Sequence, residues 1–193
     1  MTMLKMIKIK TESINNHIDL KGLKIEELAN QLVLTLTNKG LKLKIAESFT
    51  GGHICSLLTK ISGASAYLLE AIVCYNPTSK TDRLGVPQAS IDQFGAVSFS
   101  TITQMLDGLM GKNDINPPIN NTLNPLFFPD IAIATTGNAG PTSEKPNQAG
   151  ICYIGVATKN IKIIKKVFIK GDRTNVITNG SILAIKLALD TIK

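Results

Sequence analysis

The spacing of apolar and polar residues predicts a chain in which strands and helices follow each other in turn. Apolar residues recur at helical spacing in segments that span residues 24–39, 53–61, 78–84, 87–94, 101–110 and 174–192. Short apolar or alternating runs predict strands at residues 41–46, 71–75, 131–135, 151–157 and 161–169. Strands separated by helices are typical of a layered α/β domain with a mostly parallel sheet.

Three departures from this alternation refine the expected architecture. The last two strands are separated only by Lys159 and Asn160, which predicts an antiparallel hairpin at the edge of the sheet. Residues 1–22 are polar and irregular, and we expect an N-terminal extension of unknown structure. Residues 112–129 are rich in Pro and Asn and predict a loop insertion within one domain that spans residues 23–193.

The charge of the chain bears on the kind of partner it binds. Of its 193 residues 44% are hydrophobic and 18% are charged, as in globular proteins, and its net charge is +7. The positive charge comes almost entirely from Lys, which is scattered along the chain and does not interleave with aromatic residues. This distribution favours a general Lys-rich surface over nucleic-acid binding, and such a surface also suits a small anionic substrate.

The apolar segments are too short to anchor the chain in a membrane. No uninterrupted apolar run reaches the roughly 18 residues of a membrane span. The first residues alternate Lys with apolar side chains and lack the long apolar core of a secretory signal. We therefore expect a cytoplasmic protein with no membrane partner.

Cysteine and histidine usage predicts neither disulfides nor a metal site. Cys55, Cys74 and Cys152 each lie in an apolar run, are odd in number and lack close pairing, so we expect buried structural thiols. His17 and His53 are far apart and match no metal-ligand spacing. We expect no metal and no cofactor.

The segment most suggestive of chemistry spans residues 47–52 (Glu-Ser-Phe-Thr-Gly-Gly), between a predicted strand and a predicted helix. Ligands of parallel α/β sheets bind over loops of this kind. Ser48 and Thr50 supply hydroxyls, and Gly51 and Gly52 let amide N–H groups approach an anion. The alternative is a simple helix cap with two glycines in its turn.

A second loop, residues 135–140 (Thr-Thr-Gly-Asn-Ala-Gly), repeats this design after another buried strand. Its hydroxyls and small residues, Thr136 and Gly137 among them, predict a second wall of the same site. Neither loop matches the phosphate loop of nucleotide triphosphatases or the dinucleotide-binding fingerprint, which disfavours both classes.

A nucleophilic Ser48 needs a group that takes its proton. Lys80 follows the predicted strand 71–75 and should reach the same edge of the sheet, where burial or nearby positive charge would lower its pKa. Tyr75 could relay a proton or orient the lysine. The alternatives are that Lys80 is one of many surface lysines, and that His53, which we expect to point outward, is the base.

Arg173 is one of only two arginines in the chain. Its planar guanidinium suits a phosphate or carboxylate better than Lys does. A surface ion pair with Asp172 is the alternative.

Taken together, these motifs resemble the C-terminal domain of the CinA (competence/damage-inducible) proteins, which also occurs alone as nicotinamide-nucleotide amidase. The resemblance runs in family order from about residue 24 to residue 192. The matching stretches are residues 46–52, Tyr75-Asn76 with Lys80, residues 84–86, 95–98, 136–141 and 171–173.

The resemblance implies a three-layer α/β/α sandwich, usually in homo-oligomers, that hydrolyses nicotinamide mononucleotide to nicotinic acid mononucleotide and ammonia without a metal. By position, Ser48 matches the nucleophile and Lys80 its base. Tyr75 and Thr136 match supporting hydroxyls, and Arg173 matches a residue near the ligand. The positions expected to bind this nucleotide substrate are Thr50, Gly51, Gly52, Asn76, Thr136, Gly137 and Arg173.

Some positions depart from the family pattern. Asn138 stands where Ile or Val is usual, and Phe99 stands where an acidic residue is common. The turn at residues 145–150 is longer, and residues 112–129 form an insertion. These departures keep a second hypothesis open, a paralogue that binds a nucleotide without turning it over.

Overall fold

Strands and helices alternate along the chain much as the apolar pattern predicts. The computed structural model describes residues 8–14, 24–112, 128–142 and 148–193. Its strands are β1 (Lys8–Ile14), β2 (Leu43–Glu47), β3 (Leu68–Val73), β4 (Ile131–Gly137), β5 (Ile151–Thr158) and β6 (Ile161–Phe168). Its helices are α1 (Ile25–Asn38), α2 (His53–Thr59), the short 3₁₀ helix η1 (Ala64–Ala66), α3 (Pro77–Leu84), α4 (Gln88–Phe94), α5 (Phe99–Leu109) and α6 (Arg173–Ile192).

The strands form one mixed sheet in the order β1-β6-β5-β4-β2-β3. β5 runs antiparallel to β4 and β6, which confirms the predicted hairpin, and the other neighbouring strands are parallel. Because β2, β3, β4 and β6 run in the same direction, the segments that follow them leave from one edge of the sheet. The two predicted loops and the start of α6 all lie at that edge.

β1 is the strand that the apolar pattern does not predict. It lies inside the N-terminal extension and pairs in parallel with β6, from Lys8 opposite Ile161 to Ile14 opposite Val167. The hairpin is therefore not the outermost part of the sheet, because β1 covers β6. Pairing with an edge strand uses main-chain N–H and C=O groups and needs no apolar periodicity in the added strand. The apolar pattern therefore does not predict β1.

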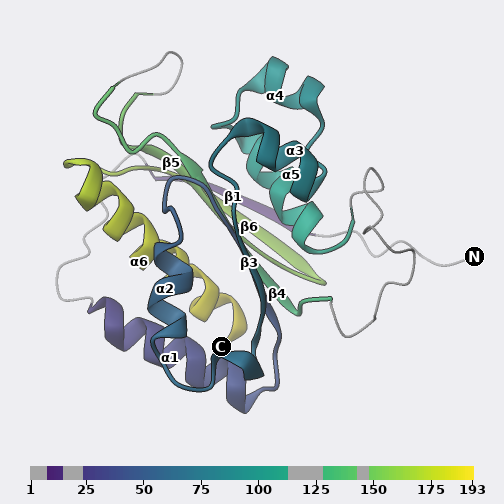
Figure 1. Ribbon diagram of the computed structural model, residues 1–193, viewed down its shortest axis with the longest axis vertical. Coiled ribbons are helices and arrows are strands. Elements are labelled where there is room, and N and C mark those ends of the chain that lie inside the picture. Colours follow the sequence, from purple (N-terminus) through teal and green to yellow (C-terminus); the bar gives the residue numbers. More distant parts are fainter. Residues whose placement is uncertain (1–7, 15–23, 113–127, 143–147) are drawn as a thin grey trace, which may run out of the picture.

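Helices cover both faces of the sheet, which confirms the three-layer α/β/α architecture (Figure 1). One layer contains α1, α2 and α6, and the other contains α3, α4 and α5. Alternate residues of β4 serve the two layers: Ile133 packs in the core beneath the first, whereas Ala132 and Ala134 pack in the core beneath the second. Small side chains on the second face let α5 lie close to the sheet.

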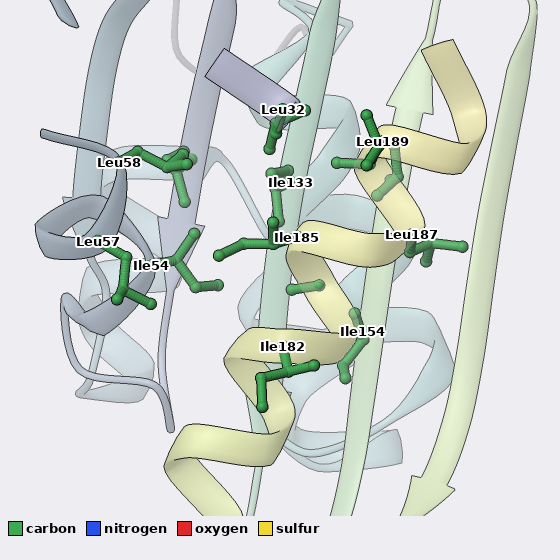
Figure 2. Packing of buried hydrophobic residues seen from close by; sticks show 14 of the residues in the cluster. Leu32, Ile54, Leu57, Leu58, Ile133, Ile154, Ile182, Ile185, Leu187 and Leu189 are labelled. Atoms are coloured by element: carbon green, nitrogen blue, oxygen red, sulfur yellow. The ribbon is translucent and has the colours of Figure 1, made fainter. Parts of the chain in front are cut away.

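The larger core lies between the sheet and the layer of α1, α2 and α6. Figure 2 shows Leu32 of α1, Ile54 of α2 and Ile185 of α6 gathered around Ile133 of β4. All four side chains are fully buried. Burial of apolar side chains at three helix–sheet contacts therefore holds this layer together.

Phe49 anchors the loop after β2 to this core and is only 3% exposed. A Cβ atom at Gly180 of α6 would lie 2.5 Å from two atoms of the Phe49 ring, so glycine is needed for this close approach. The turn that carries Ser48 is thereby held against α6.

The structure also bears on the predictions for the cysteines and for membrane-spanning helices. Cys74 and Cys152 are buried free thiols as expected, and Cys55 is a free thiol of intermediate exposure. Residues 113–127 and 143–147 lie outside the described residues, so the loop insertion and the altered turn at 145–150 stay predictions. Within the described part of the chain, no helix is long and apolar enough to cross a membrane.

Candidate active site

The structure brings Ser48 and Lys80 into direct contact. Ser48 follows the last residue of β2, and Lys80 lies in α3, which follows the neighbouring strand β3. Lys80 Nζ donates to Ser48 Oγ at 3.1 Å and to the carbonyl oxygen of Cys74 at 2.6 Å. Lys80 is 1% exposed and Ser48 is 7% exposed, so the alternative that Lys80 is a surface lysine is wrong.

Local sequence fixes the start and the end of α3 and so the position of Lys80. The Asn76 side chain caps the helix by accepting from the amide of Thr78 at 2.9 Å, and Pro77 occupies the first turn. Gly85 ends the helix in a left-handed conformation with φ 64°. Asn76 lies at the expected edge, and its side-chain oxygen is engaged in the cap.

Packing against α5 fixes the distance of α3 from its neighbours. A Cβ atom at Gly108 would lie 2.0 Å from the carbonyl oxygen of Leu84, so only glycine allows the two helices to approach this closely. Leu84 itself is buried in the core beneath this layer. Together, these contacts hold α3 against α5, with Leu84 in the core between this layer and the sheet.

Burial favours the neutral form of the Lys80 amine over the charged form. Loss of hydration lowers the pKa of Lys80 from its ordinary value of 10.5, and the nearby Cys74 opposes that shift. A neutral amine has two N–H groups and one lone pair. In that neutral form, with one N–H still donated to the Cys74 carbonyl oxygen, the lone pair can accept the Ser48 hydroxyl proton across the 3.1 Å separation, which reverses the direction of that hydrogen bond.

Thr135 of β4 holds the backbone of Ser48 in place. The Ser48 amide donates to the Thr135 carbonyl oxygen at 3.1 Å and reaches Thr135 Oγ1 at 3.3 Å. The same hydroxyl is hydrogen-bonded to Thr50 Oγ1 at 2.8 Å, and all of these groups are buried. The Thr135-Thr136 pair is visible in the sequence, but no local signal predicts that Thr135 contacts Ser48, which lies 87 positions away.

Glu47 was also missed as an individual residue. Its carboxylate accepts from the amides of Gly52 and Ile54 through Oε2, at 3.0 and 3.1 Å, and from the amide of Cys55 through Oε1 at 2.8 Å. The amide of Gly51 donates to the Ser48 carbonyl oxygen at 3.1 Å. The amides of Gly51 and Gly52, which we expected to face a ligand, therefore already have acceptors within the protein.

Arg173 and Tyr75 form a second polar group at the same edge of the sheet. Arg173 Nη1 donates to the Gly140 carbonyl oxygen at 2.7 Å, and Nη2 donates to the Tyr75 hydroxyl at 2.5 Å. The phenol is 56% exposed and is joined to the guanidinium, whereas we expected it beside Lys80. Asp172 accepts from the amide of Asn175 at 2.8 Å and so caps α6.

The end of β4 and the loop after it shape this second group. Thr136 is fully buried and donates to the Ala96 carbonyl oxygen at 2.7 Å, on the α5 side of the sheet. A Cβ atom at Gly137 would lie 2.8 Å from Cys152 Sγ, so this glycine makes room for the neighbouring strand. Asn138 accepts from the Gly140 amide and donates to the Thr142 carbonyl oxygen, both at 2.9 Å.

His53 of α2 faces α6, a helix of its own layer, and not Lys80 on the other side of the sheet. Its Nδ1 lies 3.0 Å from the hydroxyl of Ser181 in α6, which in turn donates to the Ile177 carbonyl oxygen. The imidazole is therefore half-buried against α6 and does not point outward, as we expected it to.

Comparison of the sequence with known proteins matches the chain to the CinA proteins. The model of the CinA C-terminal domain family matches residues 25–192. A protein of Caldicellulosiruptor saccharolyticus is 35% identical over 173 residues, which make up 89% of this chain and 38% of that protein. A "CinA-like protein" of Kosmotoga olearia is 31% identical over 83% of this chain and 36% of its own length. The chain thus spans less than two fifths of these relatives.

Solved structures share the fold. The competence/damage-inducible protein CihA of Agrobacterium tumefaciens superposes with a TM-score of 0.75 at 29% identity, covering 90% of this chain and 99% of that one. A CinA superfamily protein of Escherichia coli has a TM-score of 0.76 at 26% identity, covering 91% and 96% of the two chains.

Proposed function

The chain belongs to the CinA C-terminal domain family, and on that premise we propose that it hydrolyses the carboxamide of nicotinamide mononucleotide to nicotinic acid mononucleotide and ammonia. One observation carries the proposal: a buried Lys80 Nζ lies 3.1 Å from a buried Ser48 Oγ. A serine is activated as a nucleophile when a base within hydrogen-bond reach removes its proton. The lowered pKa of Lys80 supports the neutral, basic form of the amine.

The proposed reaction has two stages. In the first, Lys80 takes the Ser48 proton, Oγ attacks the carboxamide carbon, and the C–N bond breaks as Lys80 protonates the leaving ammonia. In the second, Lys80 takes a proton from water as the water oxygen attacks the ester carbon, the bond between that carbon and Ser48 Oγ breaks, and nicotinic acid mononucleotide leaves. Ser48 regains its proton through Lys80, so these two residues, the Ser48–Lys80 dyad, return to their starting state.

The carboxamide oxygen becomes negative during attack and needs a donor. The amides of Gly51 and Gly52 are engaged within the protein. We assign this role to the Thr50 amide, which has no acceptor among the described residues. Thr50 itself is held by its hydroxyl contact with Thr135.

Arg173 is the proposed contact for the anionic end of the substrate. It is exposed at the first position of α6, and two of its nitrogens are already oriented by Gly140 and Tyr75. A guanidinium has five N–H donors, so further donors remain for a phosphate. Tyr75 and Gly140 therefore act in this proposal by orienting Arg173.

The test is ammonia release from nicotinamide mononucleotide by the wild-type protein and by Ser48→Ala. We expect turnover in the wild type and a loss of about 10³-fold or more in the variant, because no other group replaces the nucleophile. Ser90→Ala is the matched control, since Ser90 is a buried serine whose hydroxyl contacts Ser100 and lies in α4. Circular dichroism establishes that each variant is folded.

The outcomes separate the two hypotheses that the sequence leaves open. Turnover that is lost in Ser48→Ala and kept in Ser90→Ala supports the amidase. Binding of the mononucleotide without ammonia release by the wild type contradicts it and favours the non-catalytic nucleotide-binding paralogue.

Family membership also supports two lesser proposals, that the protein is a homo-oligomer and that it acts in the cytoplasm. Light scattering of the purified protein tests the first, and a monomeric mass would contradict it. Cell fractionation tests the second.

A further inference from the structure

Glu47 is a buried carboxylate beside the candidate nucleophile. It is 1% exposed and directly precedes Ser48. A buried charge is costly unless it is compensated by hydrogen bonds or an opposite charge. No basic side chain forms an ion pair with it in the described part of the chain, so its compensation must come from elsewhere.

The compensation comes from the backbone at the start of α2. The carboxylate accepts three amide hydrogen bonds, from Gly52, Ile54 and Cys55, at 2.8 to 3.1 Å. The N-cap of α2 is Gly52, which has no side chain that could cap the helix. Glu47 supplies that missing cap from five residues upstream, through charge-assisted hydrogen bonds.

This cap closes the turn that carries Ser48. Gly51 and Gly52 have φ angles of 62° and 95°, and their left-handed backbone reverses the chain between β2 and α2. Gly51 donates to the Ser48 carbonyl oxygen, and Gly52 donates to the Glu47 carboxylate. These two hydrogen bonds connect the end of the turn to Glu47 and Ser48 at its start, and they restrict the Ser48 backbone.

The main chain of Glu47 is connected to Lys80 through hydrogen bonds of Cys74. Its carbonyl oxygen accepts from the Cys74 amide at 2.8 Å and from the Cys74 thiol at 3.4 Å. The Cys74 carbonyl oxygen in turn accepts from Lys80 Nζ at 2.6 Å. Side chains alternate along β2, so the Glu47 carboxylate faces α2 while Ser48 faces α3 and its lysine.

We propose that Glu47 is a positioning residue for the reaction, in which its carboxylate locks the turn of residues 48–52 onto α2 and its carbonyl holds Cys74, so that Ser48 and Lys80 keep their contact. This inference rests on the proposed amidase function, because it assigns Glu47 a part in activating Ser48. The carboxylate does not touch the substrate. Its effect on the rate is exerted through the geometry of the dyad.

Glu47→Gln tests the proposal because it keeps the side-chain length and removes one acceptor. The amide of Gln can serve Gly52 and Ile54 with its oxygen, but its NH₂ group then faces the amide of Cys55, and two donors oppose each other. Glu47→Asp retains the charge and both oxygens on a shorter side chain. Glu70→Gln is the matched control, since Glu70 is a carboxylate on the neighbouring strand that pairs with Lys44 at 3.3 Å.

Two readouts are measured well below the melting temperature of each variant. One is the kcat and KM of ammonia release from nicotinamide mononucleotide. The other needs no substrate: the rate at which a fluorophosphonate labels Ser48, in which the Oγ–P bond forms, the P–F bond breaks and Lys80 takes the proton. Mass spectrometry identifies the labelled residue.

We expect Glu47→Gln to lower both kcat and the labelling rate by about 10- to 100-fold, with little change in KM, because a small displacement of a reacting group has effects of this size. Glu47→Asp should lie between this variant and the wild type, and Glu70→Gln should match the wild type. If Glu47→Gln does not fold, Glu47→Asp gives the same comparison.

Three results would overturn the inference. The first is a folded Glu47→Gln protein, or Glu47→Asp where only that variant folds, that reacts like the wild type. The second is a loss that tracks the unfolded fraction alone. The third is a wild type that neither labels nor releases ammonia, since there is then no activated Ser48 to position. Labelling of the wild type without ammonia release contradicts only the amidase function, and the labelling rates still decide the role of Glu47.

Discussion

The dyad and the Arg173 group share one edge of the sheet and differ in almost every physical respect. Ser48 and Lys80 are buried, and each is hydrogen-bonded to a main-chain carbonyl oxygen, that of Thr135 for Ser48 and that of Cys74 for Lys80. Arg173 and Tyr75 are exposed, and they reach each other between α6 and the end of β3. One group is enclosed by the protein, and the other is open to solvent.

The difference in burial predicts different roles for the two groups. Burial changes the chemistry of a side chain, because loss of hydration lowers the pKa of Lys80 and leaves its amine able to act as a base. Exposure leaves a side chain available, because a solvated guanidinium keeps donors for an incoming anion. The comparison predicts that changes at the dyad alter kcat, whereas changes at the Arg173 group alter KM.

The largest effect is expected at Lys80. Lys80→Met keeps the apolar stem and removes the base, and we expect kcat to fall by about 10² to 10⁴-fold. Only the deprotonated amine accepts the Ser48 proton, so wild-type activity should rise with pH through the pKa of Lys80, which burial places below 10.5. Ammonia release measured across pH provides the profile.

Lys44→Met is the matched control for this prediction. Lys44 is also buried in the sheet, burial also lowers its pKa, and it pairs with Glu70 away from Ser48. An equal loss of kcat in both variants would contradict a specific role for Lys80.

A smaller effect on binding is expected at Arg173. Arg173→Lys keeps the charge and loses the two-pronged geometry that contacts Gly140 and Tyr75. Hydrogen bonds to charged groups contribute about 1.5–3 kcal/mol, so KM for nicotinamide mononucleotide should rise by roughly 10- to 100-fold with kcat largely kept.

The matched control is Arg83→Lys, at the only other arginine in the chain. Nicotinamide riboside, which lacks the phosphate, should show no such rise in KM with Arg173→Lys. A fall in kcat with unchanged KM would instead place Arg173 with the dyad and remove the contrast between the two groups.

The smallest effect is expected at Asn138, whose side chain braces the loop that carries Gly140. Asn138→Ala removes hydrogen bonds to the Gly140 amide and the Thr142 carbonyl oxygen. Only the bond to Gly140 bears on Arg173, and one neutral hydrogen bond contributes about 1 kcal/mol, which corresponds to a rise in KM of about fivefold. Asn138→Asp keeps the acceptor for Gly140 and should lie nearer the wild type in steady-state kinetics. A loss of kcat as large as that in Lys80→Met would show that this residue serves the chemistry and not the orientation of Arg173.

The sequence by itself determined the elements whose signals are local. Helical and strand periodicity located the α-helices and five of the strands to within a few residues, but not η1, because one face of each longer element must meet the core. The order of strands placed Ser48 and Lys80 at the same edge, since parallel strands end together.

Other features were decided only by tertiary structure, because they depend on groups far apart in the chain. β1 pairs with β6 through main-chain hydrogen bonds, which no side-chain pattern records. Tyr75 lies 98 positions from the Arg173 that binds it, and Thr135 lies 87 positions from Ser48.

The clearest example is the pair of neighbours Glu47 and Ser48. Both residues are visible in the sequence, but only the folded structure shows that the Glu47 carboxylate contacts α2 and that the Ser48 hydroxyl contacts Lys80. Local periodicity determines which residues face the core. Which polar partners meet there, and how far burial shifts a pKa, follows only from the packing of distant segments against each other.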